Sequence, residues 1–159
     1  MSVKIAFVPV NNSHRPLLRK WLASPHVREW WGDPEQELKL IAHDKDIDGT
    51  EGFAIMLDEV PVGYIQSWVP SQFDNEGWEQ RLSPLVRGID VFIGETSALV
   101  NGAAIIRAFT HRLFAEGRQH SVIDPNKQNL RAIRAYEKEG FKKYDETEDS
   151  LLMELKWAG

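Results

Sequence analysis

The sequence predicts one mixed α/β domain, a sheet whose strands are connected partly by helices, and three observations support this fold class. Its 159 residues correspond to one domain at roughly 100 to 200 residues per domain, so we expect a single domain over residues 1–159. Segments typical of strands alternate along the chain with segments of helical periodicity. Late in the chain, two helices each connect one strand to the next, as crossover connections do.

The first third of the chain predicts one strand and then three helices. Residues 1–10 alternate apolar and polar side chains, with Val3, Ile5 and Phe7 on one face. Turn residues at 11–13 and prolines at 25 and 34 mark helix starts, and Gly32 ends the second helix. The three helices are expected over 17–22, over 25–31, and from 34 through 41.

The middle third predicts a hairpin, a long loop and another strand. Phe53–Leu57 and Val60–Val69 are rich in β-forming residues and are separated only by Asp58-Glu59, which is typical of a hairpin. Pro70–Pro84 is polar and acidic and shows no periodicity, so we expect a loop, and loops of this length are usually functional or mobile. Val86–Ile93 reads as a strand.

The last third predicts helices and strands in alternation. The expected elements are a helix over Gly102–Glu116, a short strand at Val122-Ile123, a helix over Asn129–Glu139, and strands over Phe141–Tyr144 and Leu151–Trp157. Ligands of such sheets bind at the carboxyl ends of strands. We therefore expect a binding site near residue 93 and the helix start at residue 102.

Composition narrows the class of partner. The chain has 19 lysines and arginines against 24 aspartates and glutamates, a formal charge of −5. This balance disfavours nucleic acid and anionic membranes and favours a cationic ligand. The absence of cysteine excludes thiolate metal sites and cysteine nucleophiles, and the five histidines show no metal-binding spacing, so we expect no metal. No apolar run could span a membrane and no secretory signal is recognisable, so we expect a cytoplasmic protein.

Several residues stand out for their chemistry. Asp90 interrupts an apolar strand, where a carboxylate is costly unless it is paired or faces a cleft, although a solvent-facing position on an edge strand would also explain it. Gly102 opens a helix followed by two alanines, which would let a phosphate approach the first N–H groups or simply allow close packing. Asp124 ends a strand, and Tyr136 is as readily a core aromatic as an acid. Trp30-Trp31 could equally be plain packing.

The segment over residues 124–141 is more specific. Its letters, DPNKQNLRAIRAYEKEGF, resemble the last characteristic block of the GNAT superfamily of acyl-coenzyme A N-acyltransferases. Three further stretches, EWWG at 29–32, PVGYIQS at 61–67 and RGID at 87–90, resemble the aminoglycoside 6'-N-acetyltransferase branch and its siderophore-acylating relatives. The resemblance extends over nearly the whole chain.

The resemblance implies a GNAT-like, mixed, mostly antiparallel splayed sheet flanked by helices, with acetyl-coenzyme A (acetyl-CoA) as cosubstrate. The implied cofactor contacts are the strand backbone at Val91, Phe92 and Ile93, the pyrophosphate loop at Asn101, Gly102, Ala103 and Ala104, and Asn129. Where the family has a basic or amide residue and a further glycine, this chain has Leu99 and Val100. The phosphates would therefore depend on backbone N–H groups and the helix dipole.

By the same resemblance, Trp31, Gln66, Asp90 and Asp124 face the acceptor amine, with Trp31 as a wall. Asp90 is implied as base or amine-orienting group, and Tyr136 as proton donor to the departing thiolate. An alkylammonium of pKa about 10.4 is only about one part in 2,500 neutral at pH 7, which adds roughly 4.6 kcal/mol to the barrier. A carboxylate helps if it or a water accepts that proton, and strand N–H groups are plausible donors to the oxyanion.

Three functions are compatible with these residues. The first is acetyl-CoA-dependent N-acetylation, by direct transfer, of a primary amine on a cationic small molecule such as an aminoglycoside 6'-amine; the acidic loop over Asp74–Glu79 gives it an electrostatic reason. The second is acylation of a siderophore precursor or a polyamine. The third is a GNAT-fold protein that has lost its phosphate site and only binds a ligand. We expect a monomer or homodimer, without a nucleic acid or membrane partner.

Overall fold

The structure is a computed structural model that describes residues 3–47 and 49–157, and for residues 42–47 only the backbone. It divides into two compact units. Unit 1 comprises Met1–Ser67 and Asp90–Val100, and unit 2 comprises Trp68–Ile89 and Asn101–Gly159. Hydrogen-bonded strands follow the order β1-β2-β3-β4-β5-β7-β6, and β4 (Arg87–Ile93) contributes residues to both units. The predicted mixed, mostly antiparallel sheet with flanking helices is confirmed.

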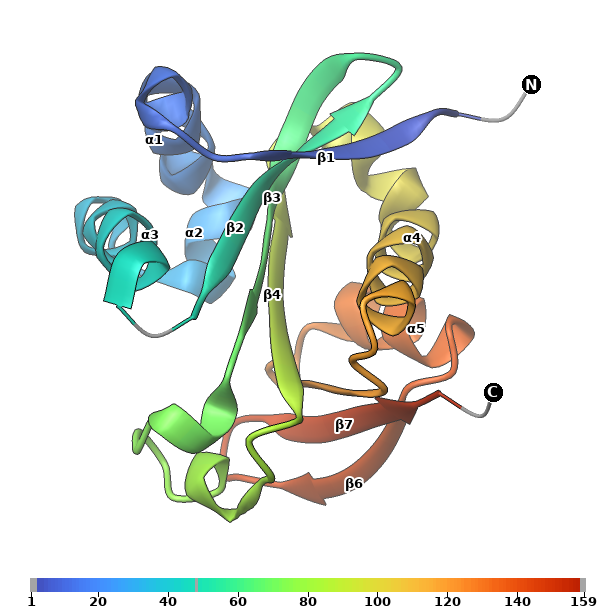
Figure 1. Ribbon diagram of the computed structural model, residues 1–159. Helices are drawn as coiled ribbons and strands as arrows, with labels where there is room; N and C mark the ends of the chain where they lie inside the picture. The colour runs from blue at the N-terminus through green and yellow to red at the C-terminus, as the bar shows by residue number, and fades with distance from the viewer. Residues whose placement is uncertain (1–2, 48, 158–159) are drawn as a thin grey trace. The chain divides into compact units, whose positions relative to one another are not determined.

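Unit 1 combines an antiparallel sheet with three helices that lie together on one side of β2 and β3 (Figure 1). Strand β2 pairs antiparallel with both β1 and β3. The elements are β1 (Ile5–Pro9), α1 (Arg15–Ala23), α2 (Pro25–Trp31), α3 (Pro34–Ile47), β2 (Glu51–Leu57) and β3 (Val60–Trp68). Proline occupies the first turn of α1 and the first position of α2, and Gly32 ends α2 with a φ of 90°, which an L side chain rarely adopts.

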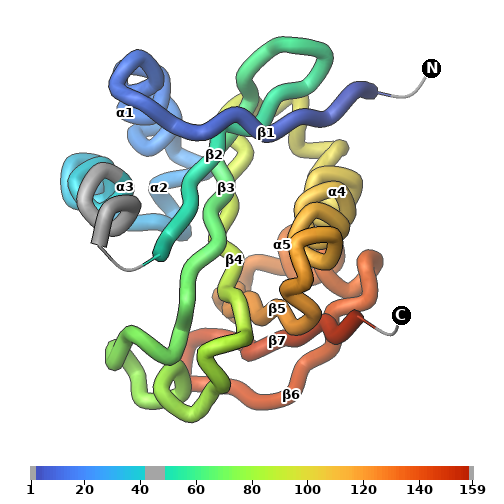
Figure 2. Tube along the Cα trace, viewed as in Figure 1, coloured from blue at the N-terminus to red at the C-terminus, as the bar shows by residue number. Residues whose placement is uncertain are grey.

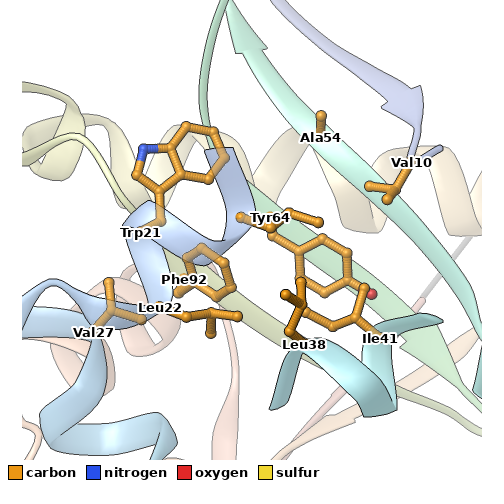
Figure 3. Packing of buried hydrophobic residues seen from close by; sticks show 10 residues of the cluster. Val10, Trp21, Leu22, Val27, Leu38, Ile41, Ala54, Tyr64 and Phe92 are labelled. Carbon is orange, nitrogen blue, oxygen red and sulfur yellow. The ribbon is translucent and has the colours of Figure 1, made fainter. Parts of the chain in front are cut away.

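The core of unit 1 lies between these helices and the sheet. Leu18, Trp21 and Leu22 form the buried face of α1 and pack with Tyr64 of β3 and Phe92 of β4 (Figure 3). Each fully buried side chain of this size contributes roughly 1.5–3 kcal/mol. The helices therefore hold the same face of β3 and β4 on which Tyr64 and Phe92 stand.

The hairpin between β2 and β3 turns at Asp58-Glu59, as predicted. Both residues have positive φ angles, 47° and 69°, which matches the right-handed twist of a tight two-residue hairpin. The Lys4 backbone N–H donates to Asp58 Oδ1 at 2.9 Å, so β1 helps to hold the turn.

Unit 2 is built on the first residues of β4 together with β5 (His120–Ile123), β6 (Lys142–Glu146) and β7 (Leu151–Lys156). Strand β5 runs parallel to β4, and β7 is antiparallel to both β5 and β6. The trace shows β5, β7 and β6 alongside one another (Figure 2). Helices α4 (Gly102–Ala115) and α5 (Leu130–Lys138) are joined by an ion pair from Arg107 Nε to Glu139 Oε1, 2.7 Å apart.

The segment predicted as a loop over 70–84 contains two short 3-10 helices, Pro70–Gln72 and Glu79–Arg81, and is closely packed. The Trp68 ring lies edge-on to Phe73 and Trp78, with centroids 5.3 and 6.2 Å away. Glu79 is only 2% exposed, and its carboxylate accepts a hydrogen bond from the Glu76 backbone N–H at 3.0 Å. Glu79 is therefore not the surface charge that the acidic-loop interpretation assumed.

Several predicted boundaries differ from the structure. The first strand begins only at Ile5, and Val3 is 39% exposed outside it. A 3-10 helix over Thr96–Asn101 lies between β4 and α4, where no regular element was predicted. Strand β6 starts one residue after the buried Phe141, and all five of its residues are exposed. Within the described residues, no helix is both long and apolar enough to cross a membrane.

Candidate functional site

Asp90 lies on β4, past the point at which the described ladder with β5 ends. Strand β4 has β3 on one side and β5 on the other, and the Asp90 side chain is only partly exposed. Its Oδ2 accepts a hydrogen bond from Gln66 Nε2 at 2.9 Å. A half-buried carboxylate that is held by a hydrogen bond is one that can attract a cation in a fixed geometry.

Gln66 is in turn held by Tyr64, a residue that the sequence argument did not single out. The Tyr64 hydroxyl donates to Gln66 Oε1 at 2.6 Å. Because alternate residues of a strand point to the same face, Tyr64 and Gln66 share one face of β3, as Asp90 and Phe92 share one face of β4. The alternation of tyrosine and glutamine within the PVGYIQS stretch is the signal that could have identified Tyr64.

Aromatic rings lie beside this hydrogen-bonded row. The Trp31 ring meets Phe92 and Tyr64 edge to face, with centroids 5.0 and 6.5 Å apart. Trp31 stays partly exposed at the end of α2, while Tyr64 and Phe92 are buried (Figure 3). Unit 1 thus brings together Trp31, Gln66 and Asp90, three of the residues predicted to face the acceptor amine. Trp31 packs against Tyr64 and Phe92, and Tyr64 is linked through Gln66 to Asp90 by hydrogen bonds.

The end of β4 is fixed by side chains from α1 and α2 that the sequence argument also missed. His26 Nε2 bonds the Ile93 carbonyl oxygen at 2.9 Å, and the Gly94 N–H donates to the Val62 carbonyl at 2.7 Å. The Ile93–Gly94 peptide group is therefore hydrogen-bonded at both its ends. A Cβ on Gly94 would come within 2.1 Å of the Trp21 ring, so that ring requires glycine there.

Of the predicted site residues, Val91, Phe92 and Ile93 belong to unit 1, whereas Asp124, Asn129 and Tyr136 lie in unit 2. Asp124 directly follows β5, and the adjoining segment is held by hydrogen bonds from the Lys127 N–H to the Asp149 carbonyl (2.8 Å) and from the Leu151 N–H to the Pro125 carbonyl (3.0 Å). Asn129 caps α5, since its side chain accepts from the Ala132 N–H at 3.4 Å.

Tyr136 and Tyr144 occupy different environments in unit 2. Tyr136 is 8% exposed on the buried face of α5, and its ring lies 6.2 Å from that of Phe141. Tyr144 is 37% exposed. Partial burial of its phenol raises its pKa to about 12, and the charges of Glu154, Asp145, Asp124 and Glu79 contribute in that order. The carboxylate of Asp124 thus belongs to an electronegative part of unit 2.

The start of α4 suits an anion in its backbone chemistry. The first turn has no acidic residue, and the Asn101 side chain makes no capping hydrogen bond in the described structure. First-turn N–H groups carry the positive end of the helix dipole, and here the 3-10 helix Thr96–Asn101 runs directly into this turn. Val100 is 85% exposed in the preceding 3-10 helix. An anion bound here would contact peptide N–H groups. At the positions of Leu99 and Val100 it would lie next to apolar side chains.

Strand β4 leaves its ladder with β5 partway along its length. The described parallel ladder between β4 and β5 consists of two pairs, Arg87 with Ser121 and Gly88 with Val122. Asp90 to Ile93 therefore lie past the paired part of β4 on the β5 side. In unit 1, a carboxylate beside aromatic rings suits an amine. In unit 2, a helix that starts with small residues suits a phosphate. An N-acyltransferase that uses acetyl-CoA binds both kinds of group.

Comparison with known proteins agrees with this class. Residues 11–148 match the family described as acetyltransferase (GNAT) domain. The chain belongs to this family of acetyltransferases.

Similar proteins have been named and solved. The chain is 34% identical over 137 residues to aminoglycoside N(6')-acetyltransferase type 1 of Klebsiella pneumoniae, which covers 80% of this chain and 68% of that protein. A kanamycin resistance protein of Rhizobium radiobacter is 41% identical over 69 residues, 42% of this chain and 64% of that one. The crystal structure of aminoglycoside acetyltransferase AAC(6')-Ib with coenzyme A and kanamycin superposes with a TM-score of 0.86 at 27% identity, over 96% of this chain and 95% of that one.

Proposed function

We propose that this chain is an acetyl-CoA-dependent N-acetyltransferase that transfers an acetyl group directly to a primary amine of a cationic small molecule, with an aminoglycoside 6'-amine as its acceptor. The observation that carries the proposal is the half-buried Asp90 carboxylate, held by Gln66 on the face where Trp31 packs against Phe92. A carboxylate beside aromatic faces suits an alkylammonium, through charge attraction and cation–π contact. The names of the relatives support the choice of acceptor.

The proposed roles in unit 1 follow from the chemistry of each side chain. Asp90 orients the ammonium group and accepts its proton, directly or through a water. Trp31 forms an apolar wall, and Gln66 fixes the carboxylate. In unit 2, Asp124 adds negative charge for the other amines of a polycationic acceptor.

The residues that bind the cosubstrate are also proposed, and the backbone at the start of α4 is suited to its phosphates. When bound, acetyl-CoA supplies the acetyl group and a thiol leaving group. The β4 backbone at Val91, Phe92 and Ile93 would hold the pantetheine arm, and the N–H groups from Asn101 to Ala104 would hold the phosphates. Asn129 is a further proposed contact, and Tyr136 would protonate the departing sulfur.

We also propose that residues 1–159 form one GNAT domain, because the family match over 11–148 includes residues of both units. The cytoplasmic location and the choice between monomer and homodimer stay predictions from the sequence.

Coenzyme A calorimetry followed by a thiol-release assay tests the function. We expect binding heat with coenzyme A and thiol release with kanamycin exceeding that with spermidine or a hydroxylated lysine. Thiol release with only spermidine or only a hydroxylated lysine would show that the chain is an acetyltransferase with a different acceptor amine. No binding heat and no thermal shift at millimolar coenzyme A would favour a protein that has lost its phosphate site and only binds a ligand. The apolar residues Leu99 and Val100 in the phosphate loop are consistent with that outcome.

Asp90→Asn tests the role of the carboxylate. General acid–base catalysis contributes about 10²- to 10⁴-fold, so we expect kcat/KM for the amine to fall by about 100-fold while coenzyme A affinity is retained. If Asp90 only attracts the cation, the loss appears chiefly in KM and shrinks as salt is added. Asp58→Asn is a matched control, since asparagine tolerates the positive φ of this exposed hairpin turn. Wild-type kinetics in Asp90→Asn would exclude the proposed role.

A further inference from the structure

We propose that Tyr64 is a positioning residue that acts through Gln66 to hold the Asp90 carboxylate in its reactive orientation. Three side chains from two adjacent strands form one hydrogen-bonded row, with Tyr64 Oη 2.6 Å from Gln66 Oε1 and Gln66 Nε2 2.9 Å from Asp90 Oδ2. The inference rests on the proposed function, because it assigns Tyr64 and Gln66 to the carboxylate on which that function depends.

The chemistry of the three groups fixes the direction of the row. An ionised carboxylate only accepts hydrogen bonds, so the Gln66 amide must present its NH₂ group to Asp90. Its carbonyl oxygen then faces Tyr64, and the phenol must donate. Tyr64 thereby selects one of the two orientations of the Gln66 amide, the one that places a donor against the carboxylate. The second N–H of the Gln66 amide can still donate a hydrogen bond to a bound acceptor molecule.

The surrounding packing holds the phenol in place. Tyr64 is 1% exposed, and its ring contacts those of Trp31 and Phe92. Gly52 on β2 is the register partner of Gln66, and a Cβ on Gly52 would lie 2.4 Å from the Tyr64 hydroxyl oxygen. Glycine at position 52 therefore leaves the space through which the hydroxyl reaches Gln66. A glycine inside a strand often marks such a close approach.

Tyr64→Phe removes the hydroxyl and keeps the ring. A net hydrogen bond of about 0.5–1.5 kcal/mol corresponds to roughly a two- to tenfold effect, so we expect kcat/KM for the amine to fall by about that factor. The KM for acetyl-CoA stays unchanged. Gln66→Leu should have at least the same effect, and the double variant should be no worse than Gln66→Leu alone, because both remove the same link to Asp90.

Two matched variants separate positioning from packing. Gly52→Ala displaces the same hydroxyl from the opposite side and should reproduce the kinetic loss of Tyr64→Phe. Thr110→Val removes another buried hydroxyl, which donates to the Arg107 carbonyl in α4. It should lower the thermal midpoint without changing kcat/KM by more than about twofold.

The side-chain amide protons of Gln66 provide a readout that needs no enzymatic activity. In the wild type, the N–H bonded to Asp90 should be shifted downfield and exchange slowly with water, and Tyr64→Phe should shift the pair and speed its exchange. Unchanged amide signals together with wild-type kinetics in Tyr64→Phe would overturn the inference, as would additive losses in the double variant. If Asp90→Asn is fully active while the Gln66 signals respond to Tyr64→Phe, the proposed function of Asp90 fails and the row is structural.

Discussion

Tyr136 is both a buried aromatic and the proposed proton donor to the departing sulfur, and the phenol group can be tested separately from the ring. Tyr136→Phe keeps the ring packed near Phe141, so we expect the fold to be retained. A donor that acts late contributes to turnover and not to amine binding. We therefore expect kcat to fall by about tenfold with little change in the KM of the amine, measured by steady-state thiol release. Wild-type turnover in this variant would leave Tyr136 as a core residue only.

At the residue scale, the sequence pattern identified groups by type but not by their partners. Asp90 and Gln66 were both expected near the amine, and the structure joins them by a hydrogen bond. Tyr64 and His26 were missed because a buried tyrosine and a lone histidine have no spacing that distinguishes them from core residues. Their roles depend on cross-strand register and on helix-to-strand packing, which local patterns do not encode.

At the scale of single elements, α4 provides the sharpest test of cosubstrate binding. Gly102→Val places a branched side chain at the helix start and should weaken coenzyme A binding at least about tenfold, measured by calorimetry, with little loss of stability because valine is a better helix former than glycine. Leu99→Arg should act in the opposite direction, since a guanidinium forms charge-assisted bonds with phosphate. Unchanged affinity in both variants would place the phosphates elsewhere.

Element types were largely predictable, and boundaries less so. The hairpin at Asp58-Glu59 and the stop at Gly32 each have a local chemical cause, and each is confirmed. The segment over 70–84 was predicted without structure because its buried residues, Pro70, Trp78 and Glu79, show no regular spacing. A packed irregular segment has no repeating pattern for the sequence to reveal.

At the scale of the whole molecule, pH-dependent stability is expected from Glu146. Hydrogen bonds and ion pairs with Lys127 and Lys143 lower the pKa of Glu146 from 4.5 to about 2. Because the folded-state pKa is below the unfolded value, this stabilisation is present above pH 4.5 and is lost as the pH falls toward 2. Denaturant unfolding at pH 7 and at pH 3 should show a smaller loss of stability in Glu146→Gln than in the wild type.

Glu148→Gln provides the control for this measurement, because Glu148 is a second exposed carboxylate two residues away. Its unfolding free energy should change with pH as in the wild type. An acid-induced loss in Glu146→Gln equal to that of the wild type would contradict the assignment of the effect to the Lys127 and Lys143 pairs.

The contact between His26 and the end of β4 also determines the tautomer of this histidine. A carbonyl oxygen has no proton to give, so the imidazole must keep its proton on Nε2 to bond Ile93. In the neutral ring, this fixes the Nε2–H tautomer and leaves the lone pair on Nδ1. The Nε2 atom is thus committed to the backbone and is unsuited to proton abstraction. His26 thus holds the end of β4 through its Nε2–H group, and the Asp90 carboxylate on the same strand is the base that we propose.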